Sequence, residues 1–280
     1  MTISLSFFII ISLSTGLSSF EKSYSHDFSP AENVHFLTVM DIIKIESELA
    51  VNSTGNNNNN KNQSSAQIHA NNAVIVYDPN TKEEIAERNE KIAKELESIL
   101  NQLLEEVKSQ TNKTQLYFTV EAIDSILEEA ITTRIKEEQI NNSTIQTLIF
   151  SNLVNTALQK YGVAFNVGID LRNTSNMYEL EATHDNFVNN HFDLLNFSSY
   201  ESALGFSQIS LSKYYNDIST TSVLLSEQNN KTITNQNYLK KLENGLKELI
   251  DSIKNKENPM KVMEIVYAKI YPNLQFLQSK

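Results

Sequence analysis

Histidines and carboxylates are the side chains of this chain that could bind a metal ion or transfer a proton, because cysteine is absent. The lack of cysteine excludes disulfides, thiolate metal ligands and thiol nucleophiles. Neutral imidazole together with carboxylate suits copper or zinc. The candidate metal ligands are His26, His35 and His69, each with carboxylates nearby. The alternative is that each is an ordinary surface or loop histidine, as we also expect for His184 and His191.

The spacing of these histidines limits what they can do together. His35 and Glu46 share one face of an expected helix, but three turns separate them, which is too far for one metal ion. His69 points into the bundle if its helix packs through the small residues Ala66, Ala70 and Ala73.

Sequence templates of common enzymes are missing. The chain has no glycine-rich phosphate loop, no Gly-x-Ser-x-Gly elbow and no His-Glu-x-x-His pair. The glutamate-rich segment from Thr81 to Val107 also lacks the Glu-x-x-His spacing of di-iron helical bundles. We therefore expect no enzymatic activity and no catalytic residues, and the sequence leaves the cofactor unknown.

Charge and composition limit the partners. The formal net charge is −11 and the pI is near 5.0, which argues against nucleic-acid binding. An envelope protein or a small ligand is the partner we expect. Only 6 glycines and 4 prolines interrupt the chain, which favours helices.

The first 19 residues resemble a secretory signal. They carry no charge, have an apolar centre and end in small residues. Because no Lys or Arg precedes the apolar run, an uncleaved anchor or a wrongly assigned start are the alternatives. No later segment is apolar enough to span a membrane. We expect an extracytoplasmic protein, either secreted or associated with the cell envelope.

Sequons along the chain are compatible with export and glycosylation, although a chain rich in Asn, Ser and Thr forms some by chance. They include the sequons that begin at Asn52, Asn62, Asn112, Asn142, Asn173, Asn196 and Asn230.

Apolar residues at spacings of three and four predict seven or eight amphipathic helices. Capping residues indicate helix starts at Ser29, Thr81, Ser143 and Ser198, and Tyr271-Pro272 is expected to end the last helix. Asn52 to Asn62 is predicted to be a flexible loop.

The fold class predicted is all-α, an antiparallel helical bundle with long polar loops. The expected divisions are a signal segment (1–19), an N-terminal helical bundle (20–171), a polar connection (172–197) and C-terminal helices packed on the same bundle (198–280).

Three segments read together resemble exported α-helical proteins of ammonia-oxidising archaea. They are Ser29 to Leu49 preceded by His26-Asp27, Thr81 to Val107, and Met263 to Tyr267 followed by Tyr271 to Leu274. The resemblance implies export, an archaeal envelope and an all-α fold. It transfers no activity and no catalytic residue.

Two functional hypotheses follow. The first is an exported, non-enzymatic helical bundle that acts as a binding or structural module of the cell envelope. The alternative is a bundle that binds copper or zinc through histidines and carboxylates, with an affinity that falls as imidazole becomes protonated below about pH 6.5.

Overall fold

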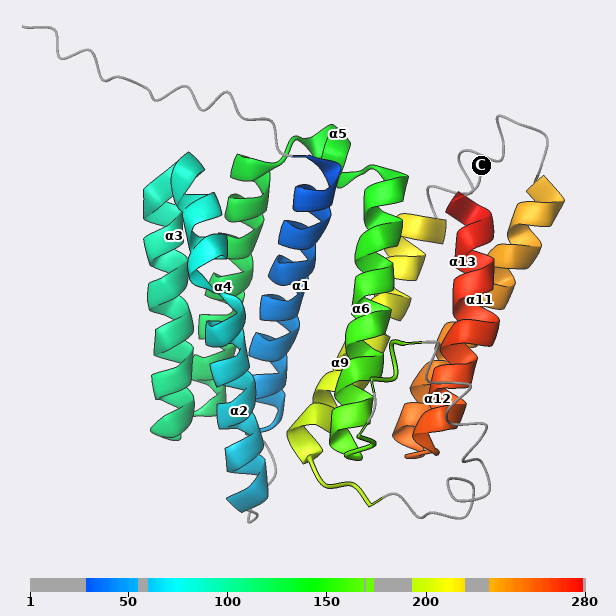
Figure 1. Ribbon diagram of the computed structural model, residues 1–280. Helices are drawn as coiled ribbons and strands as arrows, with labels where there is room; N and C mark the ends of the chain where they lie inside the picture. Colours follow the sequence, from blue (N-terminus) through cyan, green and yellow to red (C-terminus); the bar gives the residue numbers. More distant parts are fainter. Residues whose placement is uncertain (1–28, 55–59, 169, 174–192, 220–231, 279–280) are drawn as a thin grey trace, which may run out of the picture.

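The computed structural model describes residues 29–54, 60–168, 170–173, 193–219 and 232–278, and within these ranges it contains helices and turns but no strand. The predicted all-α fold is confirmed (Figure 1). Its α-helices are α1 (Pro30–Asn52), α2 (Asn60–Val76), α3 (Pro79–Lys108), α4 (Lys113–Arg134), α5 (Glu137–Ile140), α6 (Ser143–Ala164), α9 (Phe197–Lys213), α11 (Thr232–Lys254), α12 (Pro259–Ile265) and α13 (Tyr271–Gln278). Two π-helical segments, η1 (Tyr214–Ser219) and η2 (Val266–Ile270), follow α9 and α12.

Several helices begin where a side chain accepts a hydrogen bond from their first turn. Ser29 and Glu32 form the predicted capping box of α1. The other three predicted caps are wrong, because each helix begins slightly earlier, where a carboxylate or carboxamide accepts a hydrogen bond from a backbone N–H of the first turn. Thr81, Ser143 and Ser198 are replaced as caps by Asp78, Asn142 and Asn196.

Helix α3 is interrupted where the sequence predicts a continuous helix. Asn89 has φ −154° and ψ 97°, outside the helical range. Its side-chain oxygen accepts hydrogen bonds from the backbone N–H groups of Lys91 and Ile92. Asn89 therefore acts as a cap for the second part of α3.

The C-terminal helices do not end at Tyr271-Pro272, so this prediction is wrong. The backbone N–H of Tyr271 donates to the carbonyl of Val266, five residues back, within the π-helical turn η2. This wider turn accommodates Pro272, which lacks an N–H and would clash with a carbonyl in a regular helix. The helix then continues as α13.

The predicted loop from Asn52 to Asn62 is shorter than expected, because α2 already begins at Asn60. Residues 55–59 of that tract lie outside the described part of the chain, as do the signal-like residues 1–19.

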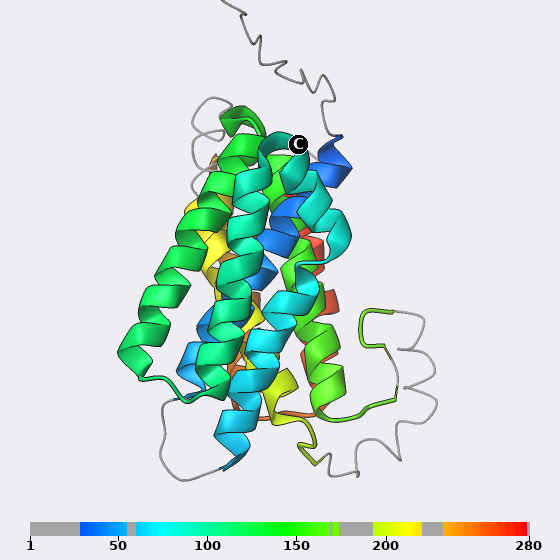
Figure 2. The same ribbon diagram turned by 90° about the vertical axis from the view of Figure 1, so that its left-hand side faces the viewer.

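Helix α1 occupies the centre of the bundle and contacts α2, α4, α6 and α9 (Figures 1 and 2). The first core cluster contains residues of the four helices α1, α2, α3 and α4, together with one face of α6 and Phe206 of α9. The second core cluster joins the other face of α6 with α9, α11, α12, η2 and α13. Helix α6 therefore belongs to both clusters.

Candidate functional site

Helix α1 carries charged side chains although most of its surface is covered by other helices. Lys44 Nζ lies 2.8 Å from the Asp124 carboxylate of α4. Asp41 lies 3.0 Å from Lys213 Nζ at the end of α9. A third charged residue, Glu46, is almost completely buried, with 1% of its surface exposed. Burying a carboxylate is costly unless it is paired and hydrogen-bonded, so its partners are of interest.

Both carboxylate oxygens of Glu46 have partners from other helices. Oε2 lies 2.7 Å from His69 Nδ1 and accepts a hydrogen bond of 3.1 Å from Asn72, both of α2. Oε1 accepts a hydrogen bond of 2.9 Å from Ser202 of α9 and lies 3.6 Å from Lys160 Nζ of α6. One carboxylate of α1 is therefore linked to α2, α6 and α9.

His69 is fully buried and lies between two carboxylates. Its Nδ1 faces Glu46, and its Nε2 lies 3.4 Å from Glu201 Oε2 of α9. The prediction that His69 points into the bundle is confirmed, since the alanines on the same side of α2 are buried as well. They are Ala66, Ala70 and Ala73.

Glu201 is held by two hydroxyl groups besides His69. Ser53, just after α1, donates to Oε1 over 3.1 Å, and Ser65 of α2 donates to Oε2. The Glu201 side chain keeps 22% of its surface exposed, in contrast to Glu46. We refer to these connected side chains as the Glu46 cluster. Its members are Glu46, Ser53, Ser65, His69, Asn72, Lys160, Glu201 and Ser202.

His69 and the two glutamates Glu46 and Glu201 shift one another's pKa in opposite directions. Burial alone would lower the pKa of His69, but the hydrogen bonds and negative charges of Glu201 and Glu46 outweigh it and raise the pKa above 6.5. Burial alone would raise the pKa of Glu46, but His69 and Lys160 lower it below 4.5. The pKa of Glu201 is lowered for the same reason, with His69 and the serines opposing burial.

This arrangement favours a protonated His69 ring between the two carboxylates over a metal ion bound to the ring and both carboxylates. The two carboxylates face opposite nitrogens of the ring, so no single ion could bind the ring and both carboxylates without rearrangement. Within the described ranges, no group of three or more His, Asp or Glu side chains has the geometry of a metal site. A protonated imidazole, by contrast, donates to both neighbours at once.

The predicted metal ligands are not brought together among the described residues. His35 is exposed near the start of α1. Glu46 follows it by eleven residues on the same helix, about 16 Å along the axis, and His69 contacts Glu46. His26, His184 and His191 lie outside the described residues.

Sequence reasoning missed most of the Glu46 cluster. Glu201 follows the predicted cap Ser198 by three residues, the spacing of a capping box, but its carboxylate reaches Ser53, Ser65 and His69 instead. A signal for Glu46 is its position on the same helix face as the apolar residues Val39 and Ile42. Nothing in the local pattern indicated that Lys160 would approach it.

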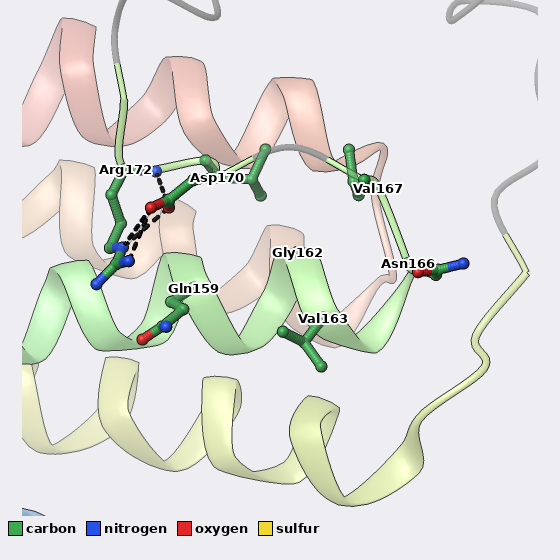
Figure 3. Close-up of a pocket in the computed structure, with 9 residues that line it drawn as sticks. Gln159, Gly162, Val163, Asn166, Val167, Asp170 and Arg172 are labelled. Atoms are coloured by element: carbon green, nitrogen blue, oxygen red, sulfur yellow. Dashed lines mark hydrogen bonds and ion pairs between the residues drawn. The ribbon is translucent and has the colours of Figure 1, made fainter.

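A surface pocket of about 360 Å³ lies at the C-terminal end of α6, lined by Val163, Asn166 and the turn that follows (Figure 3). Its charged groups already pair, since the guanidinium of Arg172 donates to the Asp170 carboxylate over 2.7 and 2.9 Å. The carbonyl of Arg172 accepts a hydrogen bond from Tyr267. These contacts hold the turn against η2 and leave no feature that identifies a ligand.

Comparison with known proteins gives no relative, since no family model, curated protein or solved structure matches the chain. None of the helices in the described ranges is both long and apolar enough to cross a membrane.

Proposed function

We propose that the chain is an exported, non-enzymatic helical bundle that acts as a binding or structural module of the cell envelope. The observation that carries the non-enzymatic part is the Glu46 cluster. Its acidic and basic side chains satisfy one another across α1, α2, α6 and α9. Side chains that pair with one another between helices stabilise the packing of those helices.

Several further contacts support a structural role. Arg134 of α4 donates to the Asn33 carboxamide of α1 over 3.3 Å and lies 2.8 Å from Glu84 of α3. Its guanidinium also stacks 4.1 Å from the ring centre of Phe36. Charged groups thus connect α1 with its neighbours at both ends of the helix.

The proposal of export rests on the sequence. Residues 1–19 have the length and apolar character of a secretory signal. Among the sequon asparagines in described segments, Asn112, Asn142 and Asn196 are exposed helix caps. Their exposure permits glycosylation but does not require it.

Cell fractionation combined with mass spectrometry of the mature N-terminus tests the export. We expect a chain that starts near residue 19 or 20 and is found in the membrane or secreted fraction. An intact Met1 in a cytosolic pool would refute this localisation.

Calorimetric titration of metal-free protein with Zn²⁺ and Cu²⁺ distinguishes the proposed module from the metal-binding alternative. The feature of the structure closest to that alternative is His69 beside two carboxylates. We expect no binding that depends on His69. Binding that is lost in His69→Gln and kept in His35→Gln would favour the metal-binding function instead.

A further inference from the structure

The contact between α2 and α9 depends on a histidine that has a carboxylate at each ring nitrogen. His69 Nδ1 lies 2.7 Å from Glu46 Oε2, and Nε2 lies 3.4 Å from Glu201 Oε2. A neutral imidazole has one N–H and can donate to only one of these carboxylates. The protonated ring can donate to both.

The charges around the ring also favour its protonation. The helices packed against it contribute Glu46 from α1, Glu201 from α9 and, through Glu46, Lys160 from α6. The remaining hydrogen-bonding neighbours are uncharged. With His69 protonated, two positive and two negative charges balance. Without the proton, the cluster has an excess negative charge in a poorly solvated place.

We propose that the α2–α9 contact is a proton-dependent closure, in which protonated His69 holds Glu201 and the first turn of α9 against α2. When Nε2 loses its proton, it can no longer donate to Glu201. The lone pair of Nε2 and the carboxylate oxygen of Glu201 are then two hydrogen-bond acceptors that face each other. The closure then loosens at α9.

The structure indicates which carboxylate is released. Glu46 is 1% exposed and keeps hydrogen bonds from Asn72 and Ser202 after His69 becomes neutral. Glu201 also keeps hydrogen bonds from Ser53 and Ser65, but because 22% of its side-chain surface is exposed it can exchange them for hydrogen bonds with water. The α1–α2 contact should therefore persist while the α2–α9 contact opens.

The direction of the pH effect follows from the pKa shifts. Because the pKa of His69 is raised by folding, its stabilisation is complete below 6.5 and is lost as pH rises through the folded value. Because the pKa values of Glu46 and Glu201 are lowered, their stabilisation is present above 4.5 and is lost as pH falls through their folded values. The closure should be tightest between these two limits.

Two further carboxylates near α9 also titrate and could be mistaken for the effect of His69. They are Asp41 and Asp217, whose pKa is raised by burial and which share Lys213 at the end of α9. These groups also make stability fall with rising pH, starting from their unfolded value of 3.8. An experiment must therefore separate the start of α9, at Glu201, from its end.

Amide hydrogen exchange of the full chain, read by mass spectrometry at about pH 5.5 and about pH 8.5, tests the closure. Exchange rates are divided by the intrinsic rates at each pH, which gives protection factors. We expect protection of the first turns of α9 to fall by up to about tenfold per pH unit as pH rises from 6.5 to the folded pKa of His69, and to stay constant above that pKa. Protection in α11, which contributes no side chain to the Glu46 cluster and belongs to the second core cluster, should stay constant.

His69→Gln and His35→Gln are the matched variants. His69→Gln should show the same low protection at the start of α9 at both pH values, and His35→Gln should behave like the unmodified chain. If His69→Gln does not fold, the comparison of α9 with α11 in the unmodified chain decides. Constant protection at the start of α9, or a pH dependence that survives in folded His69→Gln, would overturn the proposal.

Discussion

The two core clusters are similar in their apolar packing but differ in the polar groups that link their helices. In the first cluster, ionisable side chains join α1 to its neighbours, as in the pairs of Glu46 with His69 and Lys44 with Asp124. In the second cluster, tyrosine hydroxyls make the buried links, and the ion pair of Lys269 with Glu248 between η2 and α11 is half-exposed. Tyr161 donates to the carbonyl of Glu257 over 2.6 Å, and Tyr214 donates to that of Leu239 over 2.9 Å.

This difference determines how each region responds to pH. A tyrosine hydroxyl is a neutral donor, and burial raises the pKa of Tyr161, Tyr214 and Tyr271 further above 10.0. These links do not change charge near neutral pH. His69 does, because its ordinary pKa lies near 6.5. The local stability should therefore depend on pH near neutrality mainly around α2 and the start of α9.

Removing the central carboxylate should have the largest effect. Glu46→Ala leaves His69 and Lys160 without their shared partner, and such a loss from a buried pair costs about 3–5 kcal/mol. Denaturant unfolding monitored by circular dichroism measures this free energy.

An exposed ion pair provides the control for Glu46→Ala. Glu90 and Lys94 are 2.6 Å apart on the outer side of α3, with most of both side chains in water. Glu90→Ala should leave stability unchanged within error. Equal effects of the two substitutions would show that burial of the Glu46 cluster contributes nothing.

Apolar substitutions should affect the two regions alike. Leu96 of α3 and Leu246 of α11 are both fully buried, one in each cluster, so either change to Ala should cost about 2–5 kcal/mol. Neither cost should depend on pH. Ile99→Ala should cost less than Leu96→Ala, because Ile99 is only half-buried. Thermal melts compare the three variants, and a clear pH dependence of either leucine variant's loss would contradict this separation.

Removing a tyrosine hydroxyl from the second cluster should have a smaller effect. Tyr161→Phe deletes the hydrogen bond to Glu257, at a cost of about 0.5–1.5 kcal/mol. The loss should be the same at pH values on either side of the His69 titration. Tyr117→Phe is the control, since Tyr117 is exposed and its contact with Asn52 is long, at 3.4 Å. A loss for Tyr161→Phe that changes across this range would mean that the second cluster also contains a titrating link.

The sequence is a good guide to the helices because their signals are local. The apolar residues spaced three and four apart and the capping box at Ser29 lie within a few turns of the helices they specify. The predicted helix ends differ from the structure where two possible cap residues lie close together, as with Asp78 and Thr81. They also differ where a π-helical turn accommodates Pro272.

The candidate site was harder to predict because its contacts are remote in sequence. Ala66, Ala70 and Ala73 indicated that His69 faces inward. Glu201, however, lies 132 residues from His69, and no local pattern specifies that pair. Only the packing of α9 against α2 determines that this carboxylate faces a histidine.

The protonation state of His69 tests the central claim most directly. Nitrogen-15 NMR of the unmodified chain, with the His69 signals assigned by their loss in His69→Gln, reports whether each ring nitrogen carries a proton. We predict that both nitrogens are protonated at about pH 6.5 and that the ring titrates at a higher pH. A neutral single tautomer at that pH, with titration below it, would contradict the account.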